Sequence, residues 1–197
     1  MSLRATERFR IETAPPAQKC GTPSESVRFE EQRDTKWCWA ACVRMVVNAY
    51  NISSDSQCRI AERALSPLGM GITCCTSTNQ PINSGSCNQT LKDRAITKLW
   101  EKYSVAADYK YRTSVPNVND LVTELKKLLK NGPVQLGYTG IVGHVVLLYG
   151  CETPTGGPLT FLVHDPANGS KHSVVADAIV TLSGFGERLD ATWALIP

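Results

Sequence analysis

The chain has 197 residues, of which 42% are hydrophobic and 20% are charged, and its formal net charge at pH 7 is +3. This length is enough for one domain with a proper core or for two closely packed lobes. The small charge and the scattered Lys and Arg residues provide no basic stripe for nucleic acid, and no apolar run approaches the length of a membrane span.

The first part of the chain differs from the rest in composition and in hydrophobic pattern. Residues 1–30 are polar, rich in charge and Pro, and show no clear period. We expect them to form an N-terminal arm or leader, which can contribute a strand. They contain no basic region followed by an apolar region, the pattern of a secretion signal. Residues 31–197 are predicted to form the main domain.

Helices are predicted in the first part of this domain from apolar residues at helical spacing and from capping residues. The predicted helices span residues 39–50, Asp55 or Ser56 to about Leu65, residues 89–103 with Asn88 as the cap, and Asn117 or Asn119 to Lys130. Between the second and third helices, Gly and Pro residues indicate a loop over residues 67–87.

Short strands are predicted after residue 133, where turn residues separate apolar runs. The predicted strands span residues 134–138, 144–149, 159–164, 173–175 and 192–196. Helices followed by strands indicate an α+β fold rather than alternating βαβ units. We therefore expect a helical lobe over about residues 31–130 and a β lobe over about residues 131–197, with a site in the cleft between them.

Eight cysteines are many for this length, and they stand at positions 20, 38, 42, 58, 74, 75, 87 and 151. The adjacent Cys74 and Cys75, with Cys87 in the same polar loop, are typical of disulfides in an exported protein. One such bridge would add about 3 kcal/mol of stability. A zinc site built from these three and Cys58 is the alternative, although no C-x-x-C knuckle is present. The sequence alone does not fix the pairing.

Cys38 is the candidate nucleophile. It stands at the start of an apolar helix, where unpaired backbone N–H groups and the helix dipole favour a thiolate. Cys42 lies one turn further along and should face the core or a disulfide partner. If Cys38 is free, seven cysteines remain, so at least one more is unpaired or pairs between chains.

A thiolate also needs a proton-transfer partner, and histidine suits that role near neutral pH. His144 opens an apolar strand, which fixes its direction. His164 precedes Asp165 at the end of another strand, and neighbouring strand residues point to opposite faces. His172 falls in a predicted polar turn. His144 is therefore the predicted base.

Two further groups complete the candidate site. Asp165 is suited to orient the imidazole, with Asn168 as a weaker substitute. The tetrahedral intermediate needs hydrogen-bond donors for its oxyanion, and the Cys38 backbone N–H and the Gln32 amide could supply them. Gln32 alone would mean little, because an exposed glutamine before a helix is common.

These residues resemble a known family. Gln32, six positions before Cys38-Trp39-Ala40, resembles the oxyanion glutamine and nucleophile segment of papain-like cysteine proteases. The residues that precede the nucleophile in papain are absent here. The sequence distance from Cys38 to His144 is shorter than in papain, and Asp165 stands where papain-type enzymes use Asn. These differences resemble a compact bacterial branch, the secreted effector proteases that plant immune systems detect. The shared segments are Cys38-Trp39-Ala40-Ala41, Cys74-Cys75, Cys87-Asn88, Asn131-Gly132-Pro133-Val134, Gly143-His144-Val145-Val146 and Val163-His164-Asp165-Pro166.

The resemblance implies a papain-like two-lobe fold, with an antiparallel β-sheet or barrel facing the helical lobe, and a cysteine endopeptidase without cofactor or metal. In that reading Cys38 is the nucleophile, His144 the base and acid, Asp165 the orienter and Gln32 the oxyanion donor. The partner is a protein or peptide substrate, not a nucleic acid, and the location is secreted or exported. The oligomeric state is not indicated.

Two alternatives stay open. The same triad can run side-chain deamidation or amide transfer, as in a transglutaminase, because the nucleophile that resolves the acyl-enzyme sets the reaction. A papain-like fold can also serve as a binding module without catalysis.

Overall fold

The structure is a computed structural model. It describes residues 18–20, 27–66, 71–112, 114, 117–140, 143–167, 169–180 and 188–197. Asn168 and most of the predicted N-terminal arm lie outside these residues. Within the described part, none of the helices has the length and apolar character that a membrane crossing requires.

An antiparallel sheet forms the centre of the molecule, with the strand order β2-β7-β3-β4-β5-β6. Strand β1 pairs with the end of β4 that β3 leaves free. The strands are β1 (Gln18–Cys20), β2 (Ala106–Tyr111), β3 (Val134–Thr139), β4 (His144–Thr153), β5 (Thr160–Asp165), β6 (Ser170–Val175) and β7 (Arg188–Ile196).

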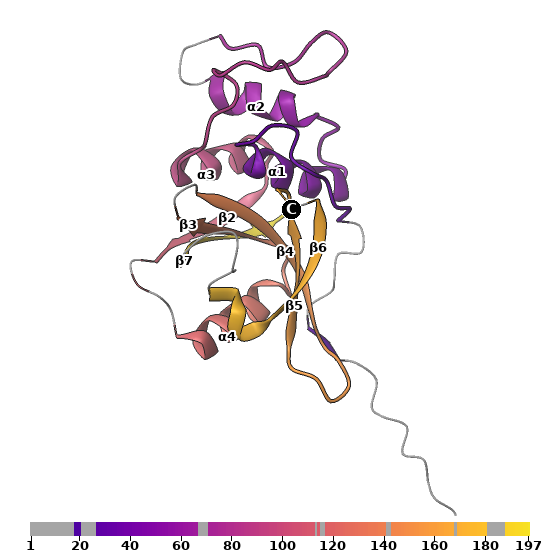
Figure 1. Cartoon of the computed structure of the whole chain (residues 1–197), viewed down its shortest axis with the longest axis vertical. Helices are drawn as coiled ribbons and strands as arrows, with labels where there is room; N and C mark the ends of the chain where they lie inside the picture. The colour runs from indigo at the N-terminus through magenta and orange to yellow at the C-terminus, as the bar shows by residue number, and fades with distance from the viewer. Residues whose placement is uncertain are drawn as a thin grey trace, which may run out of the picture.

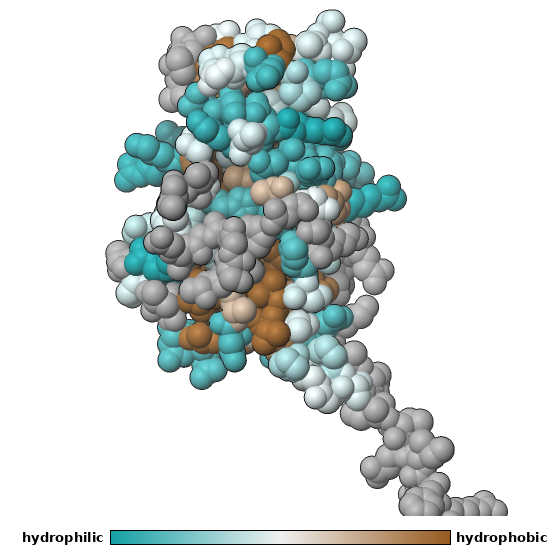
Figure 2. Space-filling view, viewed as in Figure 1, coloured by the Kyte–Doolittle hydropathy of each residue, from teal (hydrophilic) through white to brown (hydrophobic). Residues whose placement is uncertain are grey.

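Helices cover both faces of this sheet (Figure 1). The helices are α1 (Cys38–Ala49), α2 (Gln57–Leu65), α3 (Asp93–Lys102), α4 (Val118–Leu128) and the 3-10 helix η2 (Ala176–Val180). The first three lie on one face, and α4 lies with η2 on the other. On the face seen in Figure 2, polar residues cover much of the α1–α3 end, and apolar residues show in the half that holds α4.

Strand β4 shows why two cores form. Val145 and Leu147 pack into the core beneath α1, whereas Val146 and Leu148 pack into the core beneath α4. Side chains of a strand alternate between faces, so a strand buried on both faces reads as a continuous apolar run. This run made β4 predictable.

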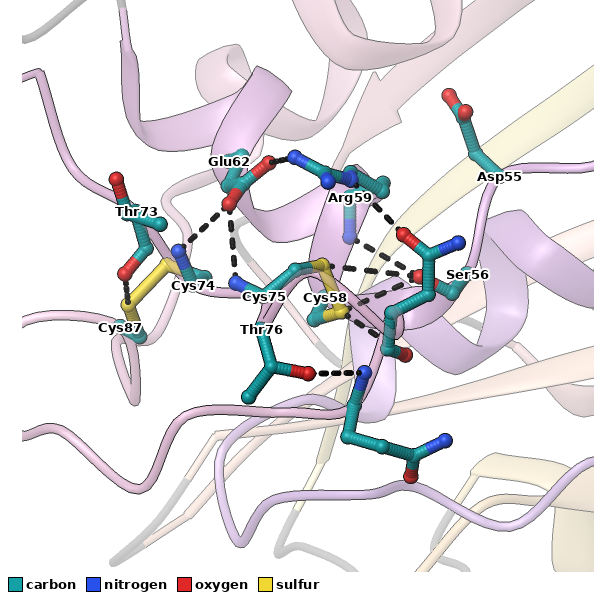
Figure 3. The surroundings of a disulfide bond; sticks show 12 residues. Asp55, Ser56, Cys58, Arg59, Glu62, Thr73, Cys74, Cys75, Thr76 and Cys87 are labelled. Atoms are coloured by element: carbon teal, nitrogen blue, oxygen red, sulfur yellow. Dashed lines mark hydrogen bonds and ion pairs between the residues drawn. A yellow bond between two sulfur atoms is a disulfide. The ribbon is translucent and has the colours of Figure 1, made fainter.

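A loop stapled by two disulfides packs beside α2 (Figure 3). Cys58 is bonded to Cys75, and Cys74 is bonded to Cys87. The Glu62 carboxylate accepts hydrogen bonds from the backbone N–H groups of Cys74 and Cys75, at 2.8 and 2.9 Å. The predicted staples are confirmed. The zinc alternative is wrong, because all four sulfurs that it required are paired.

The remaining cysteines divide between the sheet and helix α1. Cys151 on β4 is disulfide-bonded, and its register partner on β1 is Cys20. Cys38 and Cys42 are free thiols. Of the two predicted outcomes for a further cysteine, unpaired or paired between chains, the structure shows the unpaired one at Cys42.

The third helix starts later than predicted, at Asp93 rather than Gln89, and its N-cap is Lys92. Asn88, the predicted cap, instead accepts a hydrogen bond from the Lys36 backbone N–H and donates one to the Thr35 hydroxyl. A tertiary contact therefore uses the side chain that a helix cap would need. Strand β2 was not predicted, because exposed polar residues interrupt its apolar pattern.

Candidate active site

Cys38 is the first residue of α1, and its side chain is 7% exposed. The N-cap residue, Trp37, offers no side-chain hydrogen bond, and the first turn contains no acidic residue. The backbone N–H groups at this helix end therefore remain available to a negative charge. The sequence-based placement of the thiol at a helix N-terminus is confirmed.

Two tryptophans tie this helix end to the stapled loop. The Trp37 indole N–H donates to the Cys87 carbonyl at 2.8 Å, and the Trp39 indole N–H donates to the Gln89 carbonyl at 3.0 Å. Asn88 lies between these two acceptors and holds the residues just before Cys38. The Cys74–Cys87 disulfide thus anchors the segment that positions the nucleophile. The sequence indicated the staple but not this contact.

Cys42 differs from Cys38 in its surroundings. It is fully buried, and its Sγ lies 3.8 Å from the Val145 carbonyl, to which its S–H donates. Burial raises the pKa of Cys42 well above its ordinary value, and the nearby Cys38 and Asp165 charges raise it further. Cys42 therefore stays a neutral core thiol, as its position one turn into the helix predicted.

The sheet brings His144 and Asp165 together from two strands. His144 begins β4, Asp165 ends β5, and these strands pair directly. His144 Nε2 lies 2.7 Å from Asp165 Oδ1, which also accepts a hydrogen bond from the Ala167 N–H at 3.0 Å. Asp165 is completely buried. A carboxylate held in this way fixes the tautomer and orientation of the ring.

The His144 pKa reflects both neighbours. Burial alone would lower it, but hydrogen bonds to Asp165 and to the Cys38 side chain, with the negative charges of both, raise the pKa to about 9. A histidine that is protonated at neutral pH beside a thiol forms the proton-transfer half of a thiolate–imidazolium pair. Cys38 and His144 also line the same cleft.

The other two histidines lie elsewhere. His164 is fully buried, its Nε2 lies 2.9 Å from the Val27 carbonyl, and its ring stacks on Tyr149 at 4.0 Å. It points away from Asp165, as strand alternation predicted. His172 lies on β6 rather than in a turn, because strand pairing with β5 extends the sheet back to Ser170. Its Nε2 is 3.9 Å from Asp165 Oδ2.

Gln32 is linked to the other site residues through its backbone. Its N–H donates to the Pro166 carbonyl at 3.0 Å, directly after Asp165, and its side-chain Nε2 donates to the Thr35 carbonyl at 2.8 Å. Gln32 does not line the cleft that contains Cys38 and His144. The structure therefore places it in the loop that leads to Cys38 but does not aim it into that cleft.

Gln57 supports this loop, and sequence reasoning missed it. Its buried side chain accepts a hydrogen bond from the Arg33 N–H at 2.9 Å and donates to the Glu31 carbonyl at 2.8 Å. Both bonds are to backbone groups next to Gln32. No feature of the sequence links residue 57 to residue 32, since the contact depends on how α2 packs.

The cleft beside Cys38 and His144 has a volume of about 240 Å³. It lies between the N-terminal ends of α1 and α3 on one side and β3, β4 and β7 on the other. Trp193 forms part of its wall, and Gly137 is needed beside that ring. A Cβ on Gly137 would lie 3.1 Å from both the Trp193 ring and the Ala191 side chain.

Residues 24–188 match the family model described as the Peptidase_C39 like family. The chain belongs to this family. Membership in this family, together with the fold, makes the protein a cysteine peptidase, in agreement with the free thiol at the cleft. No curated protein matches the sequence.

Solved structures share its fold at low sequence identity. One is a double glycine motif protease from an AMS/PCAT transporter, crystallised with the leader peptide. It has 17% identity and a TM-score of 0.52, and the match covers 91% of this chain and 99% of that one. Another is UfSP from C. elegans, with 16% identity and a TM-score of 0.50. That match covers 86% of this chain but only 32% of UfSP. The predicted papain-like α+β fold is confirmed.

Proposed function

We propose that this protein is a cysteine endopeptidase in which Cys38, His144 and Asp165 act as a catalytic triad. The observation that carries the proposal is the arrangement around His144. One ring nitrogen contacts the buried Asp165 carboxylate at 2.7 Å, and the Cys38 side chain hydrogen-bonds to the same imidazole. Burial distinguishes the roles of the two residues beside His144. Asp165 is out of reach of solvent and orients the ring, whereas Cys38 lines the cleft and is the nucleophile.

In this mechanism the Cys38 thiolate attacks the carbonyl carbon of the scissile peptide bond. The His144 imidazolium gives its proton to the leaving amine as the C–N bond breaks, which leaves a thioester. Water then attacks the thioester and passes a proton to His144, and the acid leaves as the thiolate forms again. Asp165 stabilises the imidazolium at the start and end of the cycle.

We also propose that Gln32 donates to the oxyanion together with the Cys38 backbone N–H. Its Nε2 has two hydrogens, of which the Thr35 carbonyl accepts one. The Gln32 backbone bond to Pro166 keeps it near the triad. A modest shift of the side chain on substrate binding would bring the second hydrogen to the tetrahedral oxygen.

The finer expectations are proposals of the same kind. We propose that residues 31–197 form the catalytic domain, that residues 1–30 are an arm to it, and that the protein is an exported member of the compact bacterial effector branch. The disulfides of the loop beside α2 support export, because such bonds persist in oxidising compartments. We propose a peptide or protein as substrate, and the structural neighbour that was solved with a leader peptide supports this.

The test is cleavage of casein and of an unbiased peptide library by wild type, Cys38→Ala and Cys42→Ala. Cys38→Ala should lose at least about a thousandfold in turnover, since the nucleophile is removed. Cys42→Ala is the matched control, because it removes the other free thiol one turn away and should keep its activity. Full activity of Cys38→Ala would refute the proposal. Conversion of Gln to Glu without backbone cuts would identify a deamidase instead.

A further inference from the structure

The cleft that contains Cys38 and His144 also holds two carboxylates. Asp93, at the start of α3, and Asp190, on β7, both line it. We call these two residues the acidic wall. Asp93 has evident structural partners, because it lies in the first turn of a helix and accepts a hydrogen bond from the Tyr109 hydroxyl at 2.6 Å.

The burial of Asp190 is not explained by structural partners of this kind. It is 8% exposed, and among the described residues no side chain forms a hydrogen bond or ion pair with its carboxylate. Within the part of the chain that the structure describes, its carboxylate accepts a hydrogen bond from its own backbone N–H. A buried charge is normally paired, because its desolvation is costly. Asp190 therefore lines the cleft with Arg188 as a nearby positive charge, but without a hydrogen bond or ion pair to another described side chain.

An irregularity of the backbone accounts for the position of Asp190 at the cleft. The pairing of β3 with β7 shifts register between Gly137 and Tyr138, so that Gly137 pairs with Ala191 and Tyr138 with Leu189. Asp190 is the extra residue at this irregularity. Bulges of this kind redirect a side chain and are common beside active sites.

The charge of Asp93 acts on Asp190. Burial raises the pKa of Asp190, and the Asp93 charge raises it further, against the opposing effect of Arg188. Burial and both aspartates also raise the pKa of Tyr109. Lys36 lines the same cleft, but among the described residues no ion pair joins it to either carboxylate. A cation entering the cleft would relieve this repulsion.

The apolar part of the cleft wall fits the aliphatic stem of a long side chain. Leu91, Ile96 and Trp193 line the cleft with the acidic wall. The Trp193 indole is held by its N–H bond to the Thr97 hydroxyl at 3.1 Å, and its ring centroid lies 5.2 Å from that of Tyr109. Lys and Arg bury an aliphatic stem against apolar surface and keep the charged head near carboxylates or aromatic faces.

We propose that the acidic wall of Asp93 and Asp190 receives a lysine or arginine side chain of the peptide substrate. The inference rests on the proposed peptidase function and names the class of substrate for the same cleft. Asp190 supplies a buried charge that no other described side chain satisfies by a hydrogen bond or ion pair, and Asp93, already fixed by Tyr109, adds to the negative charge. Neither residue takes part in bond cleavage.

The first test uses wild type and peptide pools in which one position at a time is fixed as Lys, Arg, norleucine or Glu. Norleucine keeps the stem of lysine and removes its charge. At one position near the cleaved bond, kcat/KM should favour Lys or Arg over norleucine by about tenfold or more, the scale of one charge-assisted contact. Glu should be worst. Equal or faster cleavage of the norleucine pool at every position would overturn the proposal.

The second test uses Asp190→Asn, which keeps the shape and removes the charge. The Lys-to-norleucine ratio should fall to about two or less, while kcat/KM for the norleucine pool changes by less than about threefold. Asp93→Asn should lower the ratio by less. Glu101→Gln, on the exposed side of α3, changes net charge equally and should keep the ratio. A ratio that survives in both aspartate variants would refute the acidic wall.

Binding separates this inference from the peptidase function. The same pools are equilibrated with Cys38→Ala protein, and bound peptides are identified by mass spectrometry. Preferential retention of Lys and Arg pools, when wild type cuts nothing, supports the acidic wall and refutes the peptidase. Cleavage of peptides by wild type without any preference for Lys or Arg supports the peptidase and refutes the acidic wall.

Discussion

The two sides of the cleft are built by different means. On the helical side, Cys38 is positioned by indole hydrogen bonds to a loop that the Cys74–Cys87 disulfide closes. On the sheet side, His144 and Asp165 are positioned by the pairing of β4 with β5 and by burial between two cores. The position of the nucleophile therefore depends on a disulfide, whereas the position of its proton-transfer partner depends on strand register.

A substitution at the site on the sheet side should lower activity more than the changes on the helical side. Asp165→Ala removes the acceptor of the His144 ring and leaves the imidazolium without its carboxylate. We expect kcat/KM to fall about a hundredfold or more, since carboxylates that orient a catalytic histidine have effects of this size or larger. Peptide hydrolysis under pseudo-first-order conditions measures it. The exposed Asp177→Asn is the control, and a loss below threefold in Asp165→Ala would separate Asp165 from catalysis.

On the helical side, removal of the Cys74–Cys87 disulfide should lower both stability and activity. The Cys74→Ala/Cys87→Ala double variant should lose about 3 kcal/mol of unfolding free energy, the chain-entropy value for a loop of this length. It should also lose activity at temperatures where it stays folded, because the Cys87 carbonyl holds the Trp37 indole. Urea unfolding and kcat/KM at low temperature measure the two effects.

The second disulfide is the matched control for the first. Cys58→Ala/Cys75→Ala opens a loop of similar length, with a sequence separation of 17 rather than 13 residues. Stability should fall by a similar amount, again about 3 kcal/mol. Activity should fall less, since neither cysteine accepts a bond from the tryptophans around Cys38. Equal losses of activity in both double variants would contradict the specific role of the Cys74–Cys87 bond.

A smaller effect should follow from Gln57, which braces the loop on both sides of Gln32. In Gln57→Ala we expect kcat to fall about tenfold with KM nearly unchanged, because an oxyanion donor acts mainly in the transition state. Steady-state kinetics separates the two constants. Gln80→Ala, on the exposed surface, is the control. A rise in KM with constant kcat would assign Gln57 to substrate binding instead.

Local pattern made most of the framework predictable. The N-terminus of α1 followed from apolar spacing after Cys38, and β4 followed from its apolar run. The α2 cap at Ser56 and the α4 cap at Asn117 were each one of two candidates from the sequence, and both form hydrogen bonds to the first turns. In these cases the residues that decide the structure lie within a few positions of one another.

Contacts between distant segments account for what was missed. Asn88 was assigned to a helix cap, but it binds residues more than 50 positions away. The Gln57 brace and the acidic wall arise only when α2, α3 and β7 are in place. Strand β2 is an edge strand whose exposed Asp108 and Lys110 hide its alternation. The cysteine pairing was equally hidden, because spacing alone allows several connectivities.

The pH dependence of Cys38 alkylation by iodoacetamide, in wild type and in His144→Gln, tests the thiolate–imidazolium pair most directly. With the His144 pKa at about 9, wild type should react rapidly at neutral pH, and its rate should change again as the imidazolium loses its proton near pH 9. In His144→Gln the neutral-pH reactivity should disappear, and a single rise at alkaline pH should remain. Identical profiles for the two proteins would contradict the pairing on which the proposed mechanism depends.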